Sequence, residues 1–243
     1  MNNYKKYIAE SLGTLFLVFI GAGAVCANYS MKMAGARPDD LVGRGQGQGA
    51  GYASAIVVFG IVIVAVVYAT SYISGSHVNP AVTISFLVTG RMDAGTAVFY
   101  IISQLLGAVI AGFFLRFLFP DAVNTVHLGT CVLGKGVEFW KALLIEAVMT
   151  FLFVFTIFAT ALGSRRTPGV LAGVAIGLVY LFGALVASSI SGGALNPARV
   201  FGPAVASGHF DYHFVWWLGP VSGGIGAVFL YDKIFSGKPA KEK

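Results

Sequence analysis

The 243-residue chain has little charge, and this deficit excludes most soluble protein classes. Asp, Glu, Lys and Arg make up 11% of the residues, against about 25% in typical soluble domains. Hydrophobic residues make up 57%. The net charge of +6 does not indicate a nucleic-acid partner, because the basic residues lie between apolar runs instead of forming a patch. The composition therefore predicts a polytopic membrane protein.

Cysteine is also scarce. The two cysteines, Cys26 and Cys131, form neither a disulfide framework nor a metal-ligand spacing, and we expect both to be buried thiols. There is no Cys/His pair at a useful spacing and no glycine-rich phosphate loop after a strand. We therefore expect a protein that is not an enzyme and that needs no cofactor or metal.

Six apolar segments have the length of about 20 residues that a membrane-spanning helix needs. They cover residues 7–29, 52–73, 95–118, 138–162, 169–188 and 212–235. Two further apolar runs, at 79–89 and 196–207, are only about half as long. Because neither can cross the bilayer alone, we expect both to be re-entrant half-helices in an all-α membrane protein.

The chain contains two similar halves, which we place at about 1–120 and 135–243 within one transmembrane domain over residues 1–243. The same triplet occurs at equivalent places in both, behind a Ser-Gly element, as Asn79-Pro80-Ala81 and Asn196-Pro197-Ala198. Each half has three spanning segments, and this odd number turns the second half upside down. Such inverted repeats place their functional elements near the membrane midplane.

The distribution of positive charge predicts the orientation. The N-terminus, the loops at 89–94 and 163–168 and the C-terminal tail carry more Lys and Arg than the opposite loops. By the positive-inside rule, both termini are expected to be cytoplasmic. The short tails favour a prokaryotic cell membrane.

Each triplet predicts the start of a helix. Proline suits the first helical turn, and Asn is a good N-cap. In an inverted repeat, the starts at Asn79 and Asn196 meet head to head and bring two positive dipole ends together. Non-helical backbone at this depth must be shielded by protein or line a watery cavity. We therefore expect a pore that is lined at Gly75, Ser76, His77, Gly192 and Ala194.

These features together resemble the major intrinsic protein (aquaporin) family over nearly the full chain. They are the two triplets behind Ser-Gly turns, Arg199 directly after the second triplet, and Glu10 and Glu146 in segments 1 and 4. Residues 196–208 and 216–220 are similar to plant tonoplast members and to prokaryotic relatives. The resemblance implies six transmembrane helices plus two half-helices in an inverted 3+3 repeat. It also implies an aqueous pore in each subunit and a homotetramer in membrane lipid.

The resemblance also assigns an outer constriction. Its four positions fall on Phe59, Ala184, Gly193 and Arg199, and Arg199 would exclude cations. Ala184 and Gly193 are small, so the constriction is expected to be wider and less polar than in a water-only pore. It would admit water and small neutral solutes such as ammonia, hydrogen peroxide or small polyols. Val200 follows the arginine where glycerol-conducting members commonly have Asp, which argues against a dedicated glycerol channel.

Three assignments stay open. The resemblance implies that Glu10 and Glu146 accept hydrogen bonds from the re-entrant loops, with a proton relay or an interfacial role as alternatives for such buried carboxylates. Some tonoplast members use a loop histidine as a fifth filter residue, but we favour a surface position for His127. Similarity to tonoplast members leaves a vacuolar membrane open.

A secondary transporter is the alternative function, because broken helices in inverted repeats also serve transporters. It would usually need ligands for a coupling ion. The only acidic residues within the spanning segments that suit this role are Glu10 and Glu146.

Overall fold

The computed structural model describes residues 3–33, 50–161 and 169–235, and these ranges contain helices but no strand. The six long helices are α1 (Asn3–Met33), α3 (Ala50–Ser74), α5 (Ala94–Leu118), α6 (Phe139–Ala161), α7 (Gly169–Ser191) and α9 (Val215–Ile234). Two short helices, α4 (Pro80–Val88) and α8 (Pro197–Ser207), coincide with the predicted half-helices. Two 3-10 turns, η1 (Pro120–Ala122) and η2 (His127–Gly129), precede α6. The predicted all-α membrane fold is confirmed.

The long helices agree with the six predicted segments to within a few residues, with one difference in character. Of the described helices, α1, α3, α5, α6 and α7 are long and apolar enough to cross a membrane. Helix α9 lies where the sixth segment was predicted but falls short of that apolarity. Its sequence contains several glycines as well as Pro220, Asp232 and Lys233, which lower its mean hydropathy.

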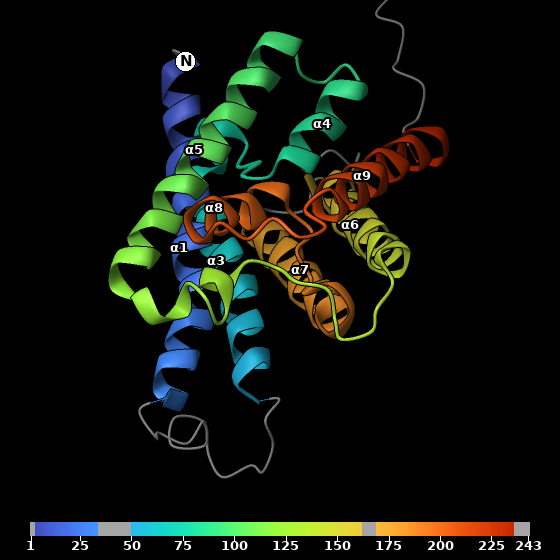
Figure 1. Cartoon of the computed structure of the whole chain (residues 1–243). Helices are drawn as coiled ribbons and strands as arrows, with labels where there is room; N and C mark the ends of the chain where they lie inside the picture. The colour runs from blue at the N-terminus through green and yellow to red at the C-terminus, as the bar shows by residue number, and fades with distance from the viewer. Residues whose placement is uncertain (1–2, 34–49, 162–168, 236–243) are drawn as a thin grey trace, which may run out of the picture.

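The helix contacts repeat between the two halves. Helix α1 packs against α3 and α5, and α6 packs in the same way against α7 and α9. The short helices cross over: α8 lies beside α5, and α4 lies beside α9 (Figure 1). Each half-helix therefore packs on the third long helix of the other half, which is the arrangement expected of an inverted repeat.

Glycines allow the closest helix contacts. A Cβ atom at Gly107 of α5 would overlap the carbonyl oxygen of Ser11 of α1. At the equivalent place in the second half, a Cβ at Gly223 of α9 would overlap the carbonyl oxygen of Ala147 of α6. Close backbone approach at small residues is how membrane helices gain packing energy without a hydrophobic driving force.

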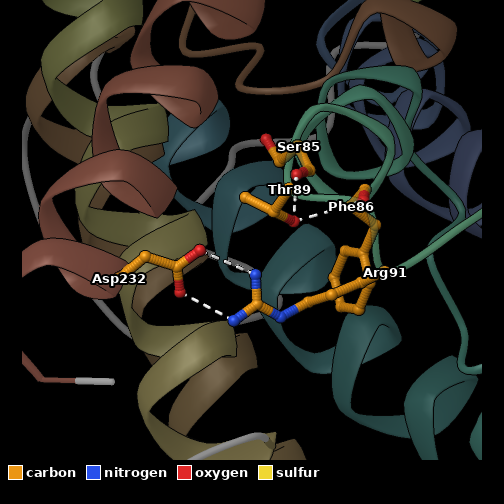
Figure 2. Close-up of polar contacts among 5 residues, drawn as sticks. All are labelled: Ser85, Phe86, Thr89, Arg91 and Asp232. Carbon is orange, nitrogen blue, oxygen red and sulfur yellow. Dashed lines mark hydrogen bonds and ion pairs between the residues drawn. The ribbon is translucent and has the colours of Figure 1, made fainter. Parts of the chain in front are cut away.

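The loop after α4 is connected to α9 by an ion pair (Figure 2). The Arg91 guanidinium donates to both carboxylate oxygens of Asp232, over 2.7 and 2.8 Å. The Arg91 backbone N–H donates to the Phe86 carbonyl, and the Thr89 hydroxyl donates to the Ser85 and Phe86 carbonyls. Since both charged side chains are about one third exposed, the pair adds little stability. Its two parallel bonds nevertheless orient the loop after α4.

Replacing Gly223 by Ala is expected to destabilise the fold by about 1–3 kcal/mol, since overpacking of close contacts costs this much. The matched control is Gly226→Ala on the same helix, where the new Cβ would lie 3.6 Å from Phe151, an ordinary contact. Thermal unfolding of the purified variants in detergent measures the difference. Equal transition temperatures for the two variants would contradict the packing account.

Candidate functional site

The two half-helices begin in the same way. Asn79 caps α4, and its Oδ1 atom accepts a hydrogen bond from the Ala81 backbone N–H at 2.9 Å. Asn196 caps α8, and its Oδ1 accepts from the Ala198 N–H at 3.0 Å. Proline follows each cap in the first helical turn. A backbone N–H at this position would have no intrahelical partner, so proline costs no hydrogen bond there. The local sequence alone therefore specifies both helix starts.

The two starts meet head to head. The Asn79 Nδ2 group donates to the Leu195 carbonyl at 2.9 Å, and the Asn196 Nδ2 group donates to the Val78 carbonyl at 2.9 Å. Each capping side chain is thus held by the loop of the other half. Both asparagines are at most 2% exposed. This reciprocal pair places two positive helix ends beside each other in the interior.

The loops before the caps have matching backbone conformations. Gly75 and Gly192 both have positive φ, which glycine adopts at little cost. Val78 and Leu195 also lie in the left-handed region, with φ of 42° and 52°. Such a conformation is unfavourable for a bulky residue, and a β-branched valine is a strained case. The surrounding contacts must therefore fix both loops.

Glu10 supplies those contacts in the first half. Its fully buried carboxylate accepts hydrogen bonds from the Ser74 hydroxyl, the backbone N–H groups of His77 and Val78, and the Gln104 amide. The donor–acceptor distances lie between 2.6 and 2.9 Å. Charge-assisted bonds of this kind are stronger than neutral ones and compensate the burial of the carboxylate.

Glu146 makes the equivalent contacts in the second half. It accepts from the Ser191 hydroxyl at 2.6 Å and from the backbone N–H groups of Ala194 and Leu195 at 2.8 Å each. Its carboxylate is also fully buried. The left-handed turn before each triplet therefore directs two consecutive N–H groups at one carboxylate.

The four positions assigned to the constriction lie together in pairs. The Arg199 guanidinium carbon lies 4.5 Å from the centroid of the Phe59 ring, which is a cation–π distance. The Gly193 backbone lies against Ala184, so closely that a Cβ at Gly193 would overlap the Ala184 carbonyl oxygen. The Arg199 Nη1 group donates to the Gly129 carbonyl at 2.7 Å. The arginine is therefore held by the loop that precedes α6.

A cavity of about 330 Å³ adjoins the asparagine pair. Both asparagines line it, together with the predicted pore residues of the first loop, Gly75, Ser76 and His77. Their counterparts Gly192 and Ala194 are not among its lining residues. Gly192 packs against Cys131, and the Ala194 carbonyl accepts a hydrogen bond from the Tyr180 hydroxyl. The two re-entrant loops thus differ in their relation to this cavity.

Sequence reasoning missed three residues that shape this region: Gln104, Gly129 and Tyr180. Gln104 interrupts an apolar segment, and an intramembrane polar residue is a signal for a buried partner. Gly129 has a φ of 78° and packs against Ala22, so its position requires glycine. The sequence contains no signal that identifies Tyr180, because aromatic residues are common in apolar helices.

His127 lies outside the constriction group. Its ring stacks on His209, with centroids 3.8 Å apart and planes at 8°. Burial lowers the pKa of His209, and the neighbouring His127 adds to this lowering. The backbone carbonyl two residues further on, at Gly129, is the group that contacts Arg199.

Comparisons with known proteins agree on one family. The model of the family described as Major intrinsic protein matches residues 1–231. Aquaporin TIP2-1 of Arabidopsis thaliana is 37% identical over 234 residues, which cover 96% of this chain and 88% of that relative. Aquaporin NIP1-1 of Zea mays is 37% identical, with 98% of this chain and 78% of the relative covered. Among solved structures, the aquaglyceroporin from Plasmodium falciparum has the same fold at a TM-score of 0.79 and 20% identity, covering 96% of this chain and 97% of its own.

Replacing Glu10 or Glu146 by Gln should destabilise the protein, because the new NH₂ group faces donors instead of accepting from them. Each buried donor left without a partner costs about 1–3 kcal/mol. The control is Glu138→Gln. The Glu138 carboxylate is exposed and forms an ion pair with Lys141, which is also exposed. Thermal unfolding in detergent should show a marked loss for the buried variants and none for the control. Equal transition temperatures for the Glu10, Glu146 and Glu138 variants would contradict this role of the buried carboxylates.

Proposed function

The chain belongs to the major intrinsic protein family and is a passive channel for water and small solutes, and we propose that this channel excludes ions and protons at two successive places. The first is the head-to-head pair Asn79 and Asn196, and the second is the constriction group around Arg199. The observation that carries the proposal is the reciprocal bonding of the two asparagine caps beside a cavity.

At the asparagine pair, exclusion of protons follows from hydrogen-bond geometry. An amide NH₂ group has two hydrogens, and each cap uses one of them for the loop of the other half. The second hydrogen of each can be donated to the oxygen of a passing water molecule. That water then directs its own hydrogens outward along the pore and cannot relay a proton across the pair. The two positive helix ends also repel cations.

At the constriction, Arg199 supplies a fixed positive charge and Phe59 an aromatic wall. The Gly129 carbonyl and the Phe59 ring hold the guanidinium in place. Ala184 and Gly193 leave the other side small and weakly polar. We infer that neutral solutes such as ammonia, hydrogen peroxide and small polyols compete with water for entry, because lining groups and pore diameter set selectivity.

The remaining features of the proposal concern assembly and location. We propose one channel unit over residues 1–243, with repeats at about 1–120 and 135–243, that forms a homotetramer in the membrane with both termini cytoplasmic. Relatives named as aquaporins support a channel instead of an enzyme. Relatives of the TIP type come from plants and support a vacuolar membrane, whereas none of the relatives described above supports the expected prokaryotic cell membrane.

The channel and transporter hypotheses differ in their kinetics. Purified protein in liposomes is tested by stopped-flow light scattering with water, glycerol and ammonia. A channel should give flux that rises linearly with the gradient and has a low activation energy. Saturable uptake that depends on an ion gradient would instead favour the secondary transporter. Protein-free liposomes supply the baseline.

Replacing Arg199 by Val should leave water flux in place and raise the conductance of cations or protons. A unit charge at about 4 Å contributes up to about 4 kcal/mol at an effective dielectric constant of about 20, and each loss of about 1.4 kcal/mol from a barrier gives about a tenfold rate increase. Proton and potassium leakage is measured in dye-loaded liposomes. Unchanged leakage would remove Arg199 from the barrier.

A further inference from the structure

Tyr180 lies where the constriction group adjoins the cavity. It is on α7, four residues before Ala184, and residues at this spacing share one face of a helix. Its ring centroid is 6.5 Å from that of Phe59 and 5.4 Å from that of Phe153, edge-on to the latter. The side chain is 1% exposed and is itself one of the residues that line the cavity. Tyr180 therefore contacts both regions.

The Tyr180 hydroxyl connects the ring to the second re-entrant loop. It donates to the Ala194 carbonyl at 2.6 Å, across the boundary between α7 and the second re-entrant loop. The Ala194 N–H is already bonded to Glu146. Both polar backbone groups of Ala194 are thus engaged within the protein. The Ala194 carbonyl, at a position predicted to line the pore, accepts a hydrogen bond from the phenol.

The position of the Tyr180 ring affects the width of the opening that Ala184 and Gly193 predict. Ala184 and Gly193 alone indicate a wide opening, and their backbones lie in direct contact. One turn along α7, however, the phenol ring occupies the space next to Phe59. The phenol ring therefore borders both the constriction residue Phe59 and the cavity that Asn196 lines.

We propose that Tyr180 is a specificity-determining residue of the channel, whose ring limits the width of the passage between the constriction and the asparagine pair. The inference rests on the proposed function and refines its solute range. Water and ammonia pass the ring, whereas glycerol is held back even though Ala184 and Gly193 are small. Packing against Phe59 and Phe153 holds the ring, and the hydroxyl adds a bond to the Ala194 carbonyl.

The test compares Tyr180→Ala with Tyr180→Phe in proteoliposomes, by the ratio of glycerol to water permeability. The alanine variant should raise this ratio about tenfold or more, since a change of one methylene in a tight site already shifts discrimination about 10- to 200-fold. The phenylalanine variant keeps the ring packed between Phe59 and Phe153 and should keep the ratio of the unmodified protein. An unchanged ratio in the alanine variant, or an equal rise in both variants, would overturn the proposal.

Tyr231→Ala is the matched control. This buried tyrosine on α9 packs against Phe155 and Phe158 and is not among the residues that line the cavity. Its loss should leave the permeability ratio unchanged, and a rise equal to that of Tyr180→Ala would mean general loosening and would overturn the proposal. If Tyr180→Ala does not elute as a folded protein in size-exclusion chromatography, Tyr180→Leu takes its place with the same expected direction.

The outcomes separate this inference from the function beneath it. If the unmodified protein moves no more water than protein-free liposomes, the proposed function fails. If the unmodified protein conducts water and the Tyr180 variants keep its ratio, only the role of Tyr180 fails.

Discussion

Two buried carboxylates determine the geometry of the whole interior. Glu10 and Glu146 each bind a serine hydroxyl and two consecutive backbone N–H groups of a re-entrant loop. These acceptors offset part of the strain at the left-handed Val78 and Leu195. The loops in turn present the carbonyls that hold the two asparagine caps. The orientation of both half-helices therefore depends on charges placed in the first and fourth spanning helices.

The two halves reach the same geometry with different side chains. The Ser74 carbonyl accepts from the Tyr100 hydroxyl at 2.8 Å, and the equivalent Ser191 carbonyl accepts from the Trp216 indole N–H at 2.9 Å. Each aromatic residue lies on the third long helix of its own half. A phenol and an indole thus perform one task, because a buried carbonyl requires a donor but not a particular one. Such substitutions hide the repeat from a comparison of residue identities.

The sequence was informative where a local rule determines the structure. Asn-Pro at a helix start, apolar runs of spanning length and an odd number of spans per repeat predicted the helices and their inversion. It was less informative where a residue's partner is distant in the chain. Gln104 and Gly129 act through contacts that only the packing of α1, α5 and η2 creates. The prediction from Ala184 omitted Tyr180, because side-chain size at one position does not reveal what a neighbouring turn contributes.

Several backbone carbonyls near the asparagine pair are engaged within the protein, and this bears on selectivity. The carbonyls of Ser74, Val78, Ala194 and Leu195 all accept hydrogen bonds from side chains. Acceptors fixed in this way cannot rearrange to replace the whole hydration shell of an ion, whose desolvation without compensation is very costly. Water needs only a few partners at each step, so a passage with fixed polar groups penalises ions far more than neutral molecules. The fixed acceptors and the positive helix ends therefore act in the same direction.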